Sequence, residues 1–100
     1  MAGGYVGILV IELRFPEASS LKDKRQHLRL AKAQLQNRFG ASVAETDFHD
    51  VWQRAQLVIA LAAAETAALE HLMEGVERFL FGQAYESMLI ERSIVAPGDE

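Results

Sequence analysis

The chain has 100 residues, of which 50% are apolar and 24% charged, and its formal net charge is −4 at pH 7. Length and composition predict one domain that buries roughly two-thirds of the surface of its unfolded chain, and they exclude disorder of the whole chain. The chain contains no cysteine, which excludes disulfides, thiolate metal sites and thiol catalysis.

The first predicted element is a central strand at Tyr5–Phe15, with the sequence YVGILVIELRF. Side chains alternate along a strand with a period of two. One predicted face therefore consists of Gly7, Leu9, Ile11 and Leu13, and the other of Val6, Ile8, Val10, Glu12 and Arg14. Both faces are apolar over most of their length, which favours a strand with neighbours on both edges and cover over both surfaces.

The second predicted element is a helix from about Leu21 to Phe39. Ser20 is the expected N-cap, with Asp23 in place of the usual glutamate of a capping box, and Gly40 is expected to end the helix. The apolar face is predicted to consist of Leu21, Leu28, Ala31, Leu35 and Phe39. Beside it runs a basic stripe, which we define as Lys22, Arg25, Arg29 and Lys32.

The rest of the chain predicts a hairpin, a helix and a last strand. Weak alternation over 41–48 indicates an edge strand, and the short link 49–53 predicts antiparallel pairing with a second central strand at 54–63. An amphipathic helix is expected from Glu65 to near Gly82, before a strand from about Ala84 to Val95. Its apolar face is Leu69, Leu72, Met73, Val76, Phe79 and Leu80, and its acidic face is Glu70, Glu74 and Glu77.

The predicted order βαββαβ is that of the α+β, ferredoxin-like plan. Right-handed crossovers then place both helices on one face of a four-stranded antiparallel sheet with strand order 4-1-3-2. The helices are expected to cover Leu9, Ile11, Leu13, Leu57, Ile59 and Leu61. The other face would carry Val6, Ile8, Val10 and Val58, bordered by Glu12, Arg14, Arg54 and Gln56. Because exposed apolar patches mark interfaces, we expect self-association through this face, as a dimer.

The longest apolar runs, at 6–11 and 57–64, are shorter than the ~20 residues of a membrane-spanning helix. No positively charged segment precedes the first run, so it does not have the form of a secretion signal. We therefore expect a cytoplasmic protein without a membrane span. Its single domain is predicted at 1–96, followed by a flexible tail at 97–100.

Two segments resemble a known family. Ser20–Arg25 (SLKDKR) and Asp50–Ala55 (DVWQRA), together with 37–39 and 42–47, resemble the YlxP-like family of small bacterial proteins at matching spacing. The resemblance implies a ferredoxin-like protein of unknown function, often encoded beside translation and ribosome-maturation genes. The resemblance carries no established activity, and because the C-terminal third matches less distinctively, it assigns no functional residues there.

The basic stripe is the predicted RNA-binding feature, because lysine and arginine neutralise phosphates. Lys24 and Arg38 would extend it. The alternative is a solvated helix flank, since these side chains also extend over apolar surface with their charges in water. Residues 1–54 carry eight bases and six acids, and 55–100 carry two bases and eight acids, so the halves differ as +2 and −6. Too few aromatic residues accompany the first strand for base stacking of the RRM type.

Three other groups of residues are candidate sites. Asp47, His49 and Asp50, with Glu45 nearby, offer metal ligands, although a polar hairpin link explains them more simply. Trp52 beside Arg54 suggests either a tryptophan packed on the hairpin or a recognition corner. Glu12 is expected to pair with Arg14 and Arg54 across the strands, and His27 and His71 to face solvent. No catalytic motif is present, so we predict a non-enzymatic binding module without cofactor or metal.

Overall fold

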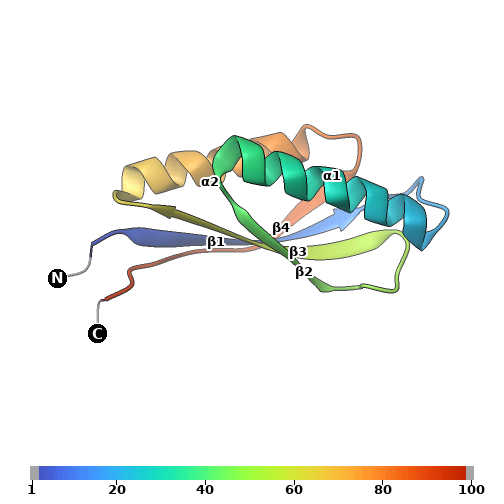
Figure 1. Cartoon of the computed structure of the whole chain (residues 1–100), viewed down its shortest axis with the longest axis horizontal. Coiled ribbons are helices and arrows are strands. Elements are labelled where there is room, and N and C mark those ends of the chain that lie inside the picture. The colour runs from blue at the N-terminus through green and yellow to red at the C-terminus, as the bar shows by residue number, and fades with distance from the viewer. Residues whose placement is uncertain (1–2, 99–100) are drawn as a thin grey trace.

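The computed structural model describes residues 3–98, so 99–100 of the predicted tail lie outside the described residues. The predicted element order is confirmed, and every bound lies close to its predicted position (Figure 1). The elements are β1 (Tyr5–Arg14), α1 (Leu21–Phe39), β2 (Ser42–Asp47), β3 (Arg54–Ala63), α2 (Thr66–Phe81) and β4 (Glu86–Val95).

The four strands form one antiparallel sheet with the order β2-β3-β1-β4, which is the predicted order read from the opposite edge. β1 pairs with β3 from Tyr5 opposite Ala63 to Arg14 opposite Arg54. On its other side β1 pairs with β4, where a register shift leaves Ile90 without a direct partner. β2 and β4 are therefore the edge strands, as the ferredoxin-like plan requires.

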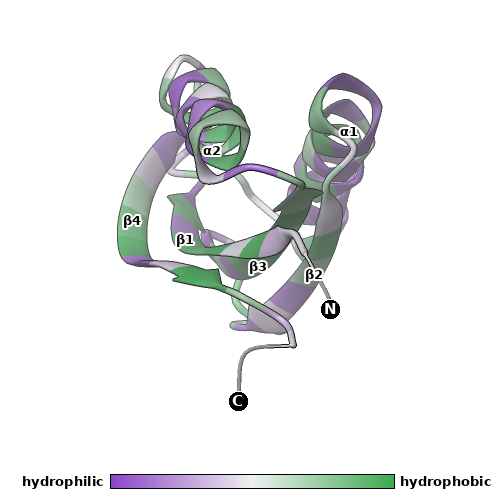
Figure 2. Ribbon diagram, turned by 90° about the vertical axis from the view of Figure 1, so that its left-hand side faces the viewer, coloured by the Kyte–Doolittle hydropathy of each residue, from purple (hydrophilic) through white to green (hydrophobic). Residues whose placement is uncertain are grey.

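Both helices lie on one face of the sheet, α1 toward the β2 side and α2 toward the β4 side (Figure 2). The six strand residues predicted to lie under the helices are all buried, with exposed fractions of 2% or less. Gly7 lets α2 approach β1 closely, because a Cβ there would lie 2.6 Å from the Met73 sulfur. The main core is thus the layer between the helices and this face of the sheet.

Ser20 caps α1 as predicted, since its hydroxyl accepts a hydrogen bond from the Asp23 backbone N–H at 3.1 Å. In a capping box the side chain at the position of Asp23 would accept a hydrogen bond from the backbone N–H of the N-cap residue, Ser20. Here the Asp23 carboxylate instead accepts hydrogen bonds from the backbone N–H and the hydroxyl of Ser19. These hydrogen bonds hold the pKa of Asp23 below its usual value. At the other end Gly40 adopts a left-handed conformation with φ 65°, and its N–H bonds to the Gln36 carbonyl.

The other face of the sheet has no covering layer within residues 3–98, so these residues do not themselves supply the cover expected over the second surface of β1. We call this surface the open face. The predicted apolar members Val6, Ile8, Val10 and Val58 are partly exposed. Neither helix of the described chain has the length and apolar character needed to span a bilayer.

Candidate functional site

The basic stripe lies on the flank of α1, away from the core. The side of α1 that packs on the sheet consists of Lys24, Leu28, Ala31 and Leu35. An α-helix turns by about 100° per residue, so the stripe residues lie about 70° to 150° around the helix axis from the centre of this buried side. Lys22, Arg25 and Arg29 are exposed and Lys32 is half-buried. Within residues 3–98 none of the four forms an ion pair, so their charges are directed to solvent.

The stripe faces away from α2. Arg38 lies on the opposite flank of α1, where its guanidinium stacks over the Phe79 ring of α2 at 4.8 Å from the centroid. Arg38 therefore does not extend the stripe, and the expectation that it would was wrong. By the same helical geometry, Phe79 marks the inner flank of α2, and the acidic residues lie on its outer flank. These are Glu70, Glu74 and Glu77.

Lys24 does not extend the stripe either, because its side chain is buried with an exposed fraction of 1%. Its ammonium donates to three backbone carbonyls of the β2–β3 connection, those of Phe48 at 2.7 Å, His49 at 3.3 Å and Arg54 at 3.0 Å. The ammonium has three protons, so all are used on carbonyls. The Glu45 carboxylate, with Oε2 at 3.2 Å from the Lys24 Nζ, therefore compensates the charge of the ammonium as an ion pair. The geometry of this contact is not that of a hydrogen bond.

The two family-like segments meet at this place and have structural roles. In the first segment, Ser20 caps α1 and Lys24 holds the β2–β3 connection. In the second, the Gln53 amide donates to the carbonyls of Pro16 and Ala18, at 3.2 and 3.4 Å. Each segment thus anchors the loop that leads into the other.

The predicted ion pairs of Glu12 are confirmed, the one with Arg54 between β3 and β1 and the one with Arg14 within β1. Its carboxylate accepts two hydrogen bonds from Arg54, both at 3.0 Å, and one from Arg14 at 2.9 Å. Glu12 is only 6% exposed although it lies on the open face. The hydrogen bonds from Arg54 and then Arg14 hold the pKa of Glu12 below its usual value, against the effect of desolvation. Arg54 also stacks on Phe48, 3.9 Å from the ring centroid.

The β2–β3 connection does not bring the candidate metal ligands together, and it does not bury Trp52. Trp52 is 51% exposed, so the predicted packing role is not supported. Asp47 accepts a hydrogen bond from the Phe48 backbone N–H, and His49 bonds to the Glu45 carbonyl. Residues 3–98 contain no group of three or more histidine, aspartate or glutamate side chains arranged to hold a metal ion.

The β4 edge is apolar and exposed, which the sequence reasoning missed. Five of the exposed large apolar side chains belong to this strand: Met88, Leu89, Ile90, Ile94 and Val95. Met88 and Val95 are opposite Glu12 and Val6 and so lie on the open face, whereas Leu89 is opposite Ile11 on the helix side. The outer edge of β4 has no strand partner among the described residues. Such an edge is typical of a surface that pairs with another chain.

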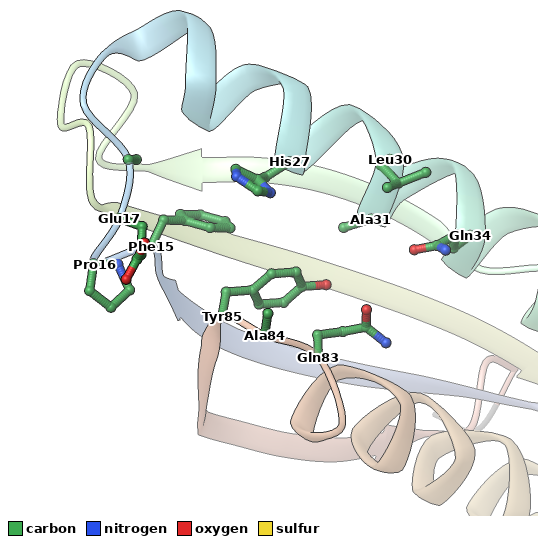
Figure 3. Close-up of a pocket in the computed structure, with 11 residues that line it drawn as sticks. Phe15, Pro16, Glu17, His27, Leu30, Ala31, Gln34, Gln83, Ala84 and Tyr85 are labelled. Carbon is green, nitrogen blue, oxygen red and sulfur yellow. The ribbon is translucent and has the colours of Figure 1, made fainter.

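A cavity was also missed. It has a volume of about 190 Å³ and lies between the middle of α1 and the link from α2 to β4 (Figure 3). Most of its lining is apolar or aromatic. The lining residues are Phe15, Pro16, Glu17, Ala18, His27, Leu30, Ala31, Gln34, Gln83, Ala84 and Tyr85. His27 and His71 are exposed as expected, but the His27 ring also stacks on Phe15 at 5.5 Å between centroids.

Fold and surfaces together define a ferredoxin-like α+β protein with an open sheet face and an uncompensated basic helix flank. Residues 6–93 match the model of the family described as "Protein of unknown function (DUF503)". A curated relative, "Uncharacterized protein YlxP" of Bacillus subtilis (strain 168), is 31% identical over 75 residues, which cover 75% of this chain and 82% of the relative. The chain therefore belongs to the YlxP-like (DUF503) family.

Proposed function

We propose that the protein is a non-enzymatic binding module that docks on structured RNA, with the ribosome as the favoured setting, through the basic stripe. The observation behind this proposal is the separation of charge across the helical layer. Four bases without ion-pair partners among residues 3–98 lie on the outer flank of α1, and three glutamates lie on the outer flank of α2. A polyanion would be attracted to one side of the molecule and repelled from the other.

The stripe has the dimensions of a phosphate-binding surface. From Lys22 to Lys32 it covers ten residue steps of α1, or about 15 Å at 1.5 Å per residue. Folded RNA is recognised mainly by its shape and its phosphate and ribose groups, which a straight row of cations suits. Displacement of up to four counterions predicts that the log of the association constant falls with log salt at a slope of about −3.

The test is co-sedimentation of the protein with purified bacterial ribosomes over a series of salt concentrations. Replacing all four stripe residues by alanine should abolish most of the association and reduce the salt slope to near zero. The control is the double variant Arg78→Ala and Arg92→Ala, which removes two exposed bases outside the stripe and should retain the wild-type slope. Wild-type co-sedimentation by the fourfold variant would refute the proposal.

We infer a homodimer as the second candidate, because the open face and the β4 strand next to it are apolar. Two open faces stacked about a two-fold axis would shield Val6, Ile8, Val10 and Val58 of both copies, together with Met88 and Val95. Glu12 between Arg14 and Arg54 already has its charge compensated within each copy. The cluster of Glu12, Arg14 and Arg54 keeps one positive charge per copy at the border, so the case for a second copy rests on the apolar centre of the open face.

Light scattering after gel filtration tests the dimer. The wild-type chain should have twice the mass of one chain, and Val10→Glu or Val58→Glu should halve it, because two carboxylates would be buried in the apolar contact. Leu30→Glu is the control, since Leu30 is 59% exposed but lies on α1, outside the sheet. A monomeric wild type, or a dimer that withstands both substitutions, would exclude this contact.

A further inference from the structure

We propose that the cavity between α1 and the α2–β4 link binds a small, neutral, planar ring that carries a hydrogen-bond acceptor, such as an aromatic carboxamide. Its size fits a single ring. A volume of about 190 Å³ is somewhat larger than the ~150 Å³ of an engineered apolar cavity that takes up benzene. A bicyclic or sugar-bearing ligand would extend beyond it.

The walls of the cavity favour a flat ligand. Phe15 lies at its base, with the Tyr85 ring at 5.2 Å and the His27 ring at 5.5 Å from it, measured between centroids. Leu30 and Ala31 of α1 form the opposite wall (Figure 3). Rings of this kind contact an aromatic ligand through stacked or edge-to-face geometry, whereas a puckered ring makes poorer contact.

Tyr85 supplies the polar contact. Its hydroxyl is buried and has no hydrogen-bond partner among residues 3–98, which is an unfavourable state for a polar group. Burial raises the pKa of Tyr85 to about 12, so the phenol keeps its proton and remains a donor at neutral pH. Figure 3 shows the hydroxyl directed toward the end of the cavity where Gln34 and Gln83 lie. The Gln83 amide nitrogen donates to the Phe79 carbonyl at 3.0 Å, which leaves the Gln83 side-chain oxygen as an acceptor.

The charge of the lining argues for a neutral ligand. It contains no lysine or arginine, and its one carboxylate is that of Glu17. A phosphate or carboxylate ligand would therefore enter without a lysine or arginine to compensate its charge, at a desolvation cost that a neutral ligand avoids. The cavity also lies on the flank of α1 opposite the basic stripe, so this site is independent of the RNA proposal.

The test is a titration of the ¹⁵N-labelled protein with benzamide, followed by amide chemical shifts. We expect saturable shifts confined to the lining residues, with a dissociation constant of about 1 mM for so small a probe. Tyr85→Phe should weaken binding about tenfold, because it removes one hydrogen bond from a buried site. Tyr5→Phe is the matched control, since Tyr5 lies outside this cavity, and it should bind like the wild type.

Two further probes separate the effect of the flat ring from the effect of ligand charge. Cyclohexanecarboxamide keeps the amide but loses the flat ring, and benzoate keeps the ring but adds a charge; both should bind more weakly than benzamide by about tenfold or more. The proposal is overturned if benzamide causes no saturable shifts, if the shifts lie elsewhere, or if Tyr85→Phe binds as well as the wild type. Tyr85→Phe removes an unpaired hydroxyl and is expected to fold, so a loss of binding can be assigned to the hydrogen bond.

Discussion

Lys24 shows how a charged side chain can be a structural residue. The burial of Lys24 could have been inferred from helical spacing, because Lys24, Leu28, Ala31 and Leu35 share one side of α1. The prediction gave more weight to its charge than to its spacing and so assigned it to the stripe. The sequence could not show which three carbonyls accept hydrogen bonds from the Lys24 ammonium, because these carbonyls belong to the β2–β3 connection, which is distant in the chain.

Lys24→Met should destabilise the fold by about 3–5 kcal/mol, because it leaves the Glu45 carboxylate without its buried partner and three carbonyls without donors. Urea unfolding followed by circular dichroism measures this change. Lys22→Met is the control: Lys22 is exposed two residues earlier on the same helix, and its replacement should change stability by less than about 0.5 kcal/mol. Equal stability of both variants would show that Lys24 is not a structural anchor.

The central strands were predictable because burial imposes a period of two on them. In β3 the burial pattern alternates regularly along Ala55, Leu57, Ile59 and Leu61, and β1 shows the same alternation over most of its length. β4 has no such pattern, because only half of its residues are apolar and it lies at an edge where neither side is fully covered. The register shift at Ile90 disturbs its alternation further. Its apolar composition was therefore visible, but its exposure was not.

The cavity was not predictable for a different reason. Its lining comes from three segments that are distant in the chain, 15–18, 27–34 and 83–85. No local spacing connects them, and each segment is explained locally by a connector or a helix face. The basic stripe, in contrast, lies within one helix, so its residues could be placed together from the sequence. Sites within one element can be predicted from periodicity, whereas sites between elements require the packing.

The charge asymmetry between the two halves of the chain survives folding. The halves of +2 and −6 would cancel if the charged faces of the two helices met. In the structure α1 and α2 lie side by side with their inner flanks together, at Arg38 and Phe79, and their charged flanks point in opposite directions. Because the surfaces remain distinct, binding to a polyanion depends on the local field of α1 and not on the net charge of −4.

The ion pairs of Glu12 connect the two central strands, so they should govern how the whole molecule unfolds in acid. Arg54 and Arg14 hold the pKa of Glu12 below its usual value of 4.5. A carboxyl with a lower pKa in the folded than in the unfolded state stabilises the protein above the unfolded pKa. This contribution is lost as pH falls through the folded pKa. Wild-type stability should therefore decrease below about pH 4.5 in part because Glu12 takes up a proton.

Glu12→Gln should remove this contribution. The variant is expected to be less stable than the wild type at pH 7, and the difference should shrink as pH falls, because the wild-type carboxyl is then also neutral. Urea unfolding at a series of pH values from 7 to about 2.5 measures the difference directly. Glu70→Gln on the exposed flank of α2 is the control for the loss of one acid. A difference that stays constant with pH would mean that the hydrogen-bonding shape of the Glu12 side chain, and not its charge, joins β1 to β3.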